Sequence, residues 1–431
     1  MSFFRQASYS TISYCVSALL LLLTGVITAR FLGPEGRSYY AVFFTIAGIA
    51  AQFLYFGISK ANIYFLNREK SPYGVLFGNS LFFIAVLSIF SAILILLFQS
   101  QIMRFFPRLP MEWILLFLWG GILIQVVSDI YSSFLLGKHK YGLYAMCGFL
   151  IALAAFFTAF AAYVMPDEVI GVIGFRVAVA VGVVVILFAV VWKVTRPELG
   201  LSIPLLWKQL GFGIKNNVIN ITASLNYRVY ILFLTVMVSP EVAGLYSVAM
   251  LFVEPMRLLP GGVGPVLLSR LSDEACDETH RQMTARTCRI IMALIVLGTV
   301  FYVPLAPLIL QYVFGMDYMP ALNAIWIMMA AGIVGVPFQV MTNHFTSRSM
   351  QRYSIYAGVL ALIVAVLSCY GLMPVYGLIG GAAAYFLSAF VASAVSLLFF
   401  AKHSQITLKD TMIVRKQDVR DLATILQARR A

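Results

Sequence analysis

The sequence predicts an all-α integral membrane protein with twelve transmembrane helices in two six-helix repeats. Hydrophobic residues make up 61% of the 431 positions and charged residues only 11%, whereas soluble domains have about 25% charged residues. The apolar residues form continuous runs of about 20, a length that suits helices crossing a bilayer and not the alternating strands of a barrel. In addition, segments of the first half return in the second half.

The internal repeat has an offset of 206 residues. Three pairs of segments show it: 34–42 with 240–248, 141–145 with 353–357, and 169–174 with 375–380. The middle pair is offset by 212, which a six-residue insertion explains if the following segment is shorter by six residues. A repeat of this length divides the chain into an N-terminal lobe, 1–200, and a C-terminal lobe, 201–402. A basic tail, 403–431, follows, for which an amphipathic interfacial helix and a solvated tail are both open.

Twelve apolar segments separated by short turns give the predicted helices. They are 8–30, 38–62, 75–98, 112–136, 141–165, 168–193, 212–238, 242–270, 287–314, 320–346, 352–373 and 376–401. The longest connection, 194–211, joins the lobes, and a short interfacial helix is expected in it.

The lysines and arginines of the connections predict the orientation. With both termini in the cytoplasm, 21 of the 30 fall on the cytoplasmic side and four on the opposite side, as the positive-inside rule requires. The same asymmetry accounts for the net charge of +13. Nucleic acid is therefore not an expected partner.

Two helices in equivalent positions of the repeats carry polar stripes. In helix 38–62 the stripe is Gly48, Gln52, Tyr55, Ser59 and Asn62, and in helix 242–270 it is Tyr246, Met250, Glu254, Arg257 and Gly261. Their spacings of three and four place each set on one helix face. Gly48 and Glu254 align at the repeat offset, so the two stripes occupy equivalent faces.

The preceding helix of each repeat also has a polar face. These faces are Ser10, Tyr14, Ser17, Thr24 and Thr28 in helix 8–30, and Asn217, Asn220, Ser224 and Arg228 in helix 212–238. Pointed at one another, the four faces would enclose a central hydrated cavity; alternatively, they bind helices to each other. The residues expected to line the cavity are Gln52, Tyr55, Lys60, Lys215, Asn217, Asn220, Arg228, Glu254 and Arg257.

Two carboxylates within the predicted spans are candidates for coupling transport to a proton or a sodium ion. Asp129 and Glu254 stand where charge is costly, so each is expected to have a partner or a cavity. We expect Asp129 to pair with Arg176 and Glu254 with Arg257. Pro255 and its neighbouring prolines and glycines predict that helix 242–270 is bent or broken.

Catalysis, cofactors and metal binding find little support in the sequence. The five cysteines and four histidines are scattered and form no metal-ligand pattern. The glycine-rich stretch 260–264 is not followed by Gly-Lys-Ser/Thr, so it is not a phosphate loop. No paired acids, nucleophile motif or large extramembrane loop stands out, and we do not expect an enzyme.

The stretch 29–37, Ala-Arg-Phe-Leu-Gly-Pro-Glu-Gly-Arg, together with the two repeats, resembles the polysaccharide flippases, including those for O-antigen. These belong to the multidrug/oligosaccharidyl-lipid/polysaccharide exporter superfamily. The resemblance covers 1–402 and implies a MATE-like transporter with two lobes in a V shape.

The implied substrate is an undecaprenyl-pyrophosphate-linked oligosaccharide. The family moves it by alternating access from the cytoplasmic to the periplasmic leaflet of a bacterial inner membrane, for O-antigen, capsule or exopolysaccharide. Membrane lipids, H⁺ or Na⁺, and polysaccharide polymerase and chain-length proteins are the implied partners.

Three other functions compete with the flippase. Multidrug antiporters of the superfamily commonly bind cationic drugs and often have an acid in the first helix, whereas helix 8–30 has none. Lipid II flippases usually have fourteen helices, two more than predicted here. A non-transporting scaffold of a polysaccharide assembly complex would need no polar stripes, so the stripes argue against it.

Overall fold

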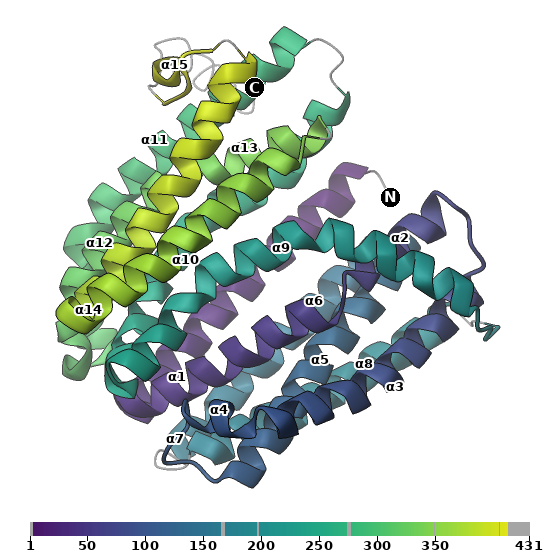
Figure 1. The fold of residues 1–431 in the computed structure, drawn as a ribbon, viewed down its shortest axis with the longest axis horizontal. Coiled ribbons are helices and arrows are strands. Elements are labelled where there is room, and N and C mark those ends of the chain that lie inside the picture. Colours follow the sequence, from purple (N-terminus) through teal and green to yellow (C-terminus); the bar gives the residue numbers. More distant parts are fainter. Residues whose placement is uncertain are drawn as a thin grey trace. The chain divides into compact units, whose positions relative to one another are not determined.

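The computed structural model describes residues 3–164, 169–195, 198–273, 277–348, 350–404 and 406–412, and helices are the only regular elements in these ranges (Figure 1). The first helices are α1 (Phe3–Leu54), α2 (Ile58–Asn67), α3 (Tyr73–Leu97), α4 (Gln99–Met103), α5 (Met111–Gly137), α6 (Tyr141–Ala159), α7 (Ala161–Val164), α8 (Val169–Thr195) and α9 (Ile203–Met237). The others are α10 (Pro240–Asp273), α11 (Asp277–Ile309), the π-helical turn η1 (Leu310–Phe314), the 3₁₀ helix η2 (Met316–Ala321), α12 (Leu322–Val334), α13 (Val336–Ser347), α14 (Arg352–Ser404) and α15 (Leu408–Met412).

Ten stretches of the described residues are long and apolar enough to cross a membrane. The two longest are Val16–Leu54 with 39 residues and Arg352–Ser404 with 53, whereas a span needs about 20. Each contains a backbone break at a glycine with positive φ, 65° at Gly33 and 52° at Gly377, a conformation that glycine adopts without strain. Each of these stretches is therefore two helices, which confirms the predicted twelve.

The chain forms two compact units, Met1–Val248 and Ala249–Ala431. Their boundary lies inside α10, so the first unit also contains α9 and the beginning of α10. The predicted lobes, 1–200 and 201–402, follow the repeats and not the packing, and this division stays a prediction. Most of the predicted tail, from residue 413 onward, lies outside the described residues.

Aromatic side chains fill the packing between α3, α5 and α8 in the first unit. The ring of Phe77, which is fully buried, lies 5.2 Å from Phe134, 6.1 Å from Tyr131 and 5.9 Å from Trp192 between centroids. Such pairs add about 1 kcal/mol each to the burial of their surfaces.

The start of α9 is anchored to α2 and α3 by a buried network of amides. Gln209 donates to Asn62 at 2.7 Å and accepts from Asn79 at 2.9 Å, while Asn62 donates to Ser80 at 3.1 Å. All four side chains are at most 1% exposed. Buried amides are stable only when their donors and acceptors are paired, so this network fixes the first turns of α9 on the first unit.

Two local expectations differ from the structure. α9 begins at Ile203 with a proline in its first turn, so the expected interfacial helix is the beginning of the spanning helix itself. α10 is continuous from Pro240 to Asp273, so of the two predicted outcomes the break is absent, and the bend stays a prediction. Neighbouring helices and local adjustments can satisfy backbone groups that a proline frees within a membrane bundle.

Candidate functional site

The polar stripe of α1 meets the polar face of α9 inside the first unit. The side-chain oxygen of Asn217 accepts hydrogen bonds from Gln52 Nε2 at 3.0 Å and from the Tyr55 hydroxyl at 2.8 Å. The Asn217 amide donates in turn to the Gln52 carbonyl at 2.9 Å. Asn217 is 1% exposed and Tyr55 is 6% exposed. Three of the predicted site residues, of which Gln52 is half-buried, therefore form one cluster that joins two spans.

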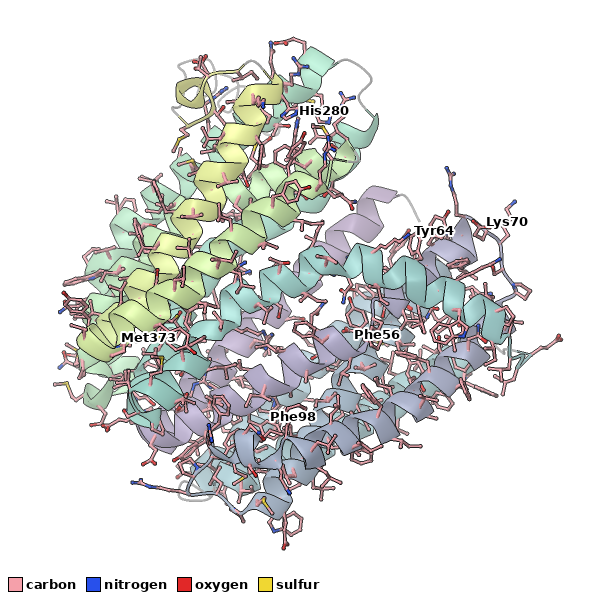
Figure 2. The ribbon with its side chains drawn as sticks, viewed as in Figure 1. Phe56, Tyr64, Lys70, Phe98, His280 and Met373 are labelled. Carbon is pink, nitrogen blue, oxygen red and sulfur yellow. The ribbon has the colours of Figure 1, made fainter. Side chains whose placement is uncertain are left out.

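The cluster lies beside an interruption in the helix. α1 ends at Leu54, Phe56 and Gly57 have φ of 48° and 70°, and α2 continues from Ile58 (Figure 2). Positive φ is uncommon for a residue other than glycine, and positions of this kind concentrate at functional sites. The sequence stripe continued straight through this point, so its periodicity gave no sign of the interruption.

Arg228 reaches the same stripe three turns further along α9. Its Nη1 donates to the Phe44 carbonyl at 3.2 Å. The guanidinium also lies against Gly48, where an added Cβ would stand 2.5 Å from Nη1. Any larger residue at position 48 would displace the guanidinium. The absence of a side chain at Gly48 therefore leaves the space that Arg228 occupies.

The remaining predicted residues of the first unit are dispersed. Asn220 is half-buried and lies near the Tyr55 hydroxyl. Lys60 is half-buried on α2. Lys215 is exposed and lines a separate open pocket with Lys208. Of the helix 8–30 stripe, the side chains of Ser10 and Tyr14 lie outside the described residues, and Thr24 and Thr28 bond carbonyls of their own helix.

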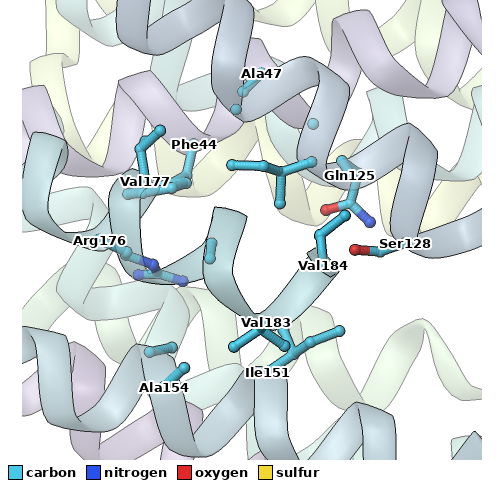
Figure 3. A pocket seen from close by; sticks show the side chains of 15 residues that line it. Phe44, Ala47, Gln125, Ser128, Ile151, Ala154, Arg176, Val177, Val183 and Val184 are labelled. Carbon is cyan, nitrogen blue, oxygen red and sulfur yellow. The ribbon is translucent and has the colours of Figure 1, made fainter. Parts of the chain in front are cut away.

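A cavity of about 140 Å³ lies between α1, α5, α6 and α8 (Figure 3). Most of its lining is apolar, and the polar side chains are those of Gln125, Ser128 and Arg176. The Arg176 guanidinium donates to the Tyr40 hydroxyl and stacks over the Phe44 ring, 4.1 Å from its centroid. Helical stripes do not reveal which four helices surround a cavity, so the sequence indicated Arg176 only as a partner for Asp129.

The expected ion pair between Asp129 and Arg176 is not formed. Asp129 is half-buried, and one of its carboxylate oxygens accepts a long hydrogen bond of 3.5 Å from Gln125, on the preceding turn of α5. Arg176 is instead held by the two aromatic rings. A guanidinium over aromatic faces is stabilised without a carboxylate. The Asp129 carboxylate consequently has no cationic partner among the described residues.

In the second unit, the predicted pair on α10 has a neighbour on α14. Glu254 and Arg257 are half-buried, and the Tyr385 hydroxyl is close enough to interact electrostatically with both. Further along α10, an added Cβ at Gly264 would stand 3.1 Å from the Asn343 amide of α13. The second unit thus also places charged side chains on α10, with a phenol and an amide from neighbouring helices beside it.

These arrangements suit recognition of a polar molecule. Guanidinium groups bind phosphate oxygens with two parallel donors, and amides and phenols bond to hydroxyl groups. Among the described residues there is no group of three or more histidines, cysteines or carboxylates that could hold a metal ion.

The sequence and the fold each match known proteins. Residues 27–323 match the model of a family described as polysaccharide biosynthesis protein. No curated protein matches the chain in sequence at a significant level. The fold matches the lipid II flippase MurJ in an inward closed conformation, with a TM-score of 0.75, 15% identity, and coverage of 93% of this chain and 88% of that one.

Two further solved structures have the same fold. A multidrug resistance MATE family transporter of the MOP superfamily, in an inward-facing conformation, gives a TM-score of 0.72 at 16% identity over 90% of this chain and 94% of that one. A MOP superfamily transporter from Pyrococcus furiosus, for which a binding pocket of reverse polarity is described, gives 0.63 at 14% identity over 93% and 95%. At these identities the likeness establishes the fold, and it confirms the MATE-like architecture.

Proposed function

The chain belongs to the family of polysaccharide biosynthesis proteins, and from this premise we propose that it is a transporter that flips a lipid-linked oligosaccharide across the membrane. The substrate would be an undecaprenyl-pyrophosphate-linked oligosaccharide for O-antigen, capsule or exopolysaccharide. It would move by alternating access from the cytoplasmic to the periplasmic leaflet of a bacterial inner membrane. We propose a transporter and not an enzyme, on the family and the fold.

The observation that carries this proposal is the position of the Arg228 guanidinium against Gly48. Gly48 belongs to the same polar stripe as Gln52 and Tyr55, which bond to Asn217. A pyrophosphate cannot enter hydrocarbon unaided, because unpaired charge there costs many kcal/mol. Arg228 and Arg257 would bind its oxygens, with Lys60 and Lys215 adding positive charge along the path and Glu254 moderating the affinity. Gln52, Tyr55, Asn217 and Asn220 would meet sugar hydroxyls when the contact between α1 and α9 opens.

The first prediction tests these cations. Arg228→Ala and Arg257→Ala should each reduce surface polysaccharide at least tenfold in a flippase-deleted strain, about 1.4 kcal/mol of lost interaction. Arg→Lys should keep part of the activity, because the charge remains while the two-donor geometry is lost. Membrane protein level, followed in parallel, should stay close to that of the unaltered protein. Full complementation by the Arg228→Ala/Arg257→Ala variant would refute the cationic path.

The second prediction concerns coupling to an ion, for which Asp129 and Glu254 are the proposed groups. A carboxylate in a low-dielectric environment can bind a proton or Na⁺ during the cycle. We expect Asp129→Asn and Glu254→Gln to abolish the dependence of transport on the ion gradient in reconstituted vesicles. Glu112→Gln, at an exposed position at the start of α5, is the control. If both variants kept the normal gradient dependence, neither residue would be the coupling group.

Drug export is the competing function, because the fold is shared with a multidrug resistance transporter. Accumulation of cationic dyes in cells separates the two functions. If the chain is a flippase, deleting its gene should leave dye accumulation unchanged.

The proposed orientation has both termini in the cytoplasm, and a reporter fused after Ala431 would test it. Polysaccharide polymerase and chain-length proteins are proposed partners, to be sought by cross-linking in the native membrane.

A further inference from the structure

An open pocket of about 580 Å³ lies where α2 ends and α9 begins, within the first unit. It is separate from the cluster of Gln52, Tyr55 and Asn217. It is lined by Phe65, Glu69, Ser71, Leu205, Lys208, Gly211, Phe212 and Lys215. The buried amide network through Gln209 fixes the adjoining face of α9. This network holds the helix that forms one pocket wall in place, while Lys208, Lys215 and Glu69 themselves are exposed.

The beginning of α9 has three faces of different character. Leu206, Gln209 and Gly213 are buried against the first unit. Lys208 and Lys215, seven residues apart, project together from a second face, which forms one wall of the pocket. The third face is apolar and exposed, with Ile203 at 40%, Trp207 at 70% and Ile214 at 47%.

The exposed apolar face places this part of α9 at the membrane surface. It directly precedes the span Asn217–Met237, and tryptophan is enriched where spans meet the polar headgroups. Lysines next to a span attract anionic lipids. The pocket wall that carries Lys208 and Lys215 therefore adjoins the face that contacts lipid.

The floor of the pocket is aromatic. The Phe212 ring stacks on Tyr64 with centroids 4.3 Å apart and planes 22° apart, and Phe65 is buried beneath (Figure 2 labels Tyr64). The Tyr64 hydroxyl donates to Glu69 at 3.4 Å, which holds that carboxylate at the rim. A ligand that fits must combine an anionic head for the lysines with an apolar stem for the rings.

We infer that this pocket binds the phosphate headgroup of an anionic phospholipid. Lys208 and Lys215 against Glu69 give the lining a net charge of one positive unit, which matches the single negative charge of a phosphodiester. A diphosphate carries more charge than this lining balances. The phosphate contacts the lysines and Ser71, the glycerol stem covers Phe212, and the acyl chains leave beside Trp207. The pocket shares Lys215 with the path proposed for the transported lipid, and its other lining residues lie outside that path.

Quenching of Trp207 by brominated lipids tests the inference. The protein is reconstituted into phosphatidylcholine bilayers that contain a low mole fraction of either brominated phosphatidylglycerol or brominated phosphatidylcholine. The contribution of Trp207 is obtained by subtracting the signal of a Trp207→Phe variant. Phosphatidylglycerol should quench Trp207 more strongly than phosphatidylcholine, and this preference should fall about fivefold for each lysine removed.

The decisive variant is Lys208→Gln/Lys215→Gln, which should lose the preference while its thermal unfolding in phosphatidylcholine stays unchanged. Lys140→Gln/Lys193→Gln removes the same charge from exposed positions outside the pocket and should keep the preference. No preference in the unaltered protein, or a preference that survives in Lys208→Gln/Lys215→Gln, would overturn the inference. Inorganic pyrophosphate at matched ionic strength should change nothing; if it removes the preference, the pocket binds a diphosphate instead.

Discussion

The two copies of the repeated turn, 33–37 and 239–243, show how a duplicated sequence acquires different tasks. In the first copy the chain turns at Gly33, with φ of 65° inside α1. In the second copy it turns at Ser239, whose hydroxyl accepts a hydrogen bond from the Val242 amide at 3.2 Å and so begins α10. Both copies keep Pro-Glu as the next two residues, which favours a helix start after a turn.

The difference between the copies is largest at their fifth residue. Arg37 of the first copy is 7% exposed and donates to Thr28 at 2.6 Å and to Ser247 at 3.2 Å. Its counterpart in the second copy is Ala243, which is fully buried. The first copy supplies the arginine, and Ser247, one turn beyond the second copy, supplies one of its two acceptors. The duplicated turns therefore pack on each other as unlike partners, and their contact belongs to the first unit.

The contact between the copies is closest at Gly244. A Cβ added there would overlap the carbonyl oxygen of Pro34, and backbone cannot move aside as a flexible side chain can. Gly244→Val should lower stability by about 3 kcal/mol through overpacking, and the level of folded protein in membranes should fall sharply. Gly262→Val in the same helix has no atom within 4 Å of the added Cβ and serves as the control. Equal protein levels for the two variants would show that the copies do not need this approach.

Loss of the arginine should have the second largest effect. Arg37→Met keeps the length of the side chain and removes its hydrogen bonds to Thr28 and Ser247. We expect a loss of about 2 kcal/mol, the usual cost of removing charged hydrogen bonds from a buried place, seen as a lower thermal unfolding midpoint in detergent. Arg37→Lys should recover only part of it, because a lysine cannot donate in two fixed directions. An unchanged unfolding midpoint for Arg37→Met would show that Arg37 does not stabilise the contact.

The smallest effect is expected from the ion pair at the rim of the first copy. Arg108 Nη1 lies 2.7 Å from Glu35, but the two side chains are 74% and 40% exposed. Solvent screens such pairs, so Arg108→Ala should cost less than about 1 kcal/mol. Tyr39 also donates to Glu35, at 2.9 Å, so the carboxylate keeps a partner. A shift in the unfolding midpoint as large as that of Arg37→Met would contradict the ranking by burial.

The sequence by itself determined the twelve spans, the duplication and the polar faces, because each is a regularity along one chain. Apolar run length counts spans, a fixed offset reveals a repeat, and spacings of three and four place Gln52 and Tyr55 on one face. The same logic put Asn217 and Arg228 on a single face of α9. Both of these faces exist in the structure, and they meet.

Only the tertiary structure decided which partners these residues have. Asn217 bonds to Gln52 and Tyr55, 165 and 162 residues away, and no local pattern encodes a contact at that separation. Arg176 contacts two aromatic rings and not Asp129, because the packing of α1 and α8 places the rings within reach. The prolines of α10 predicted a bend or a break, and the helix is not broken, because tertiary packing can supply the hydrogen bonds and contacts that a proline removes from its own helix.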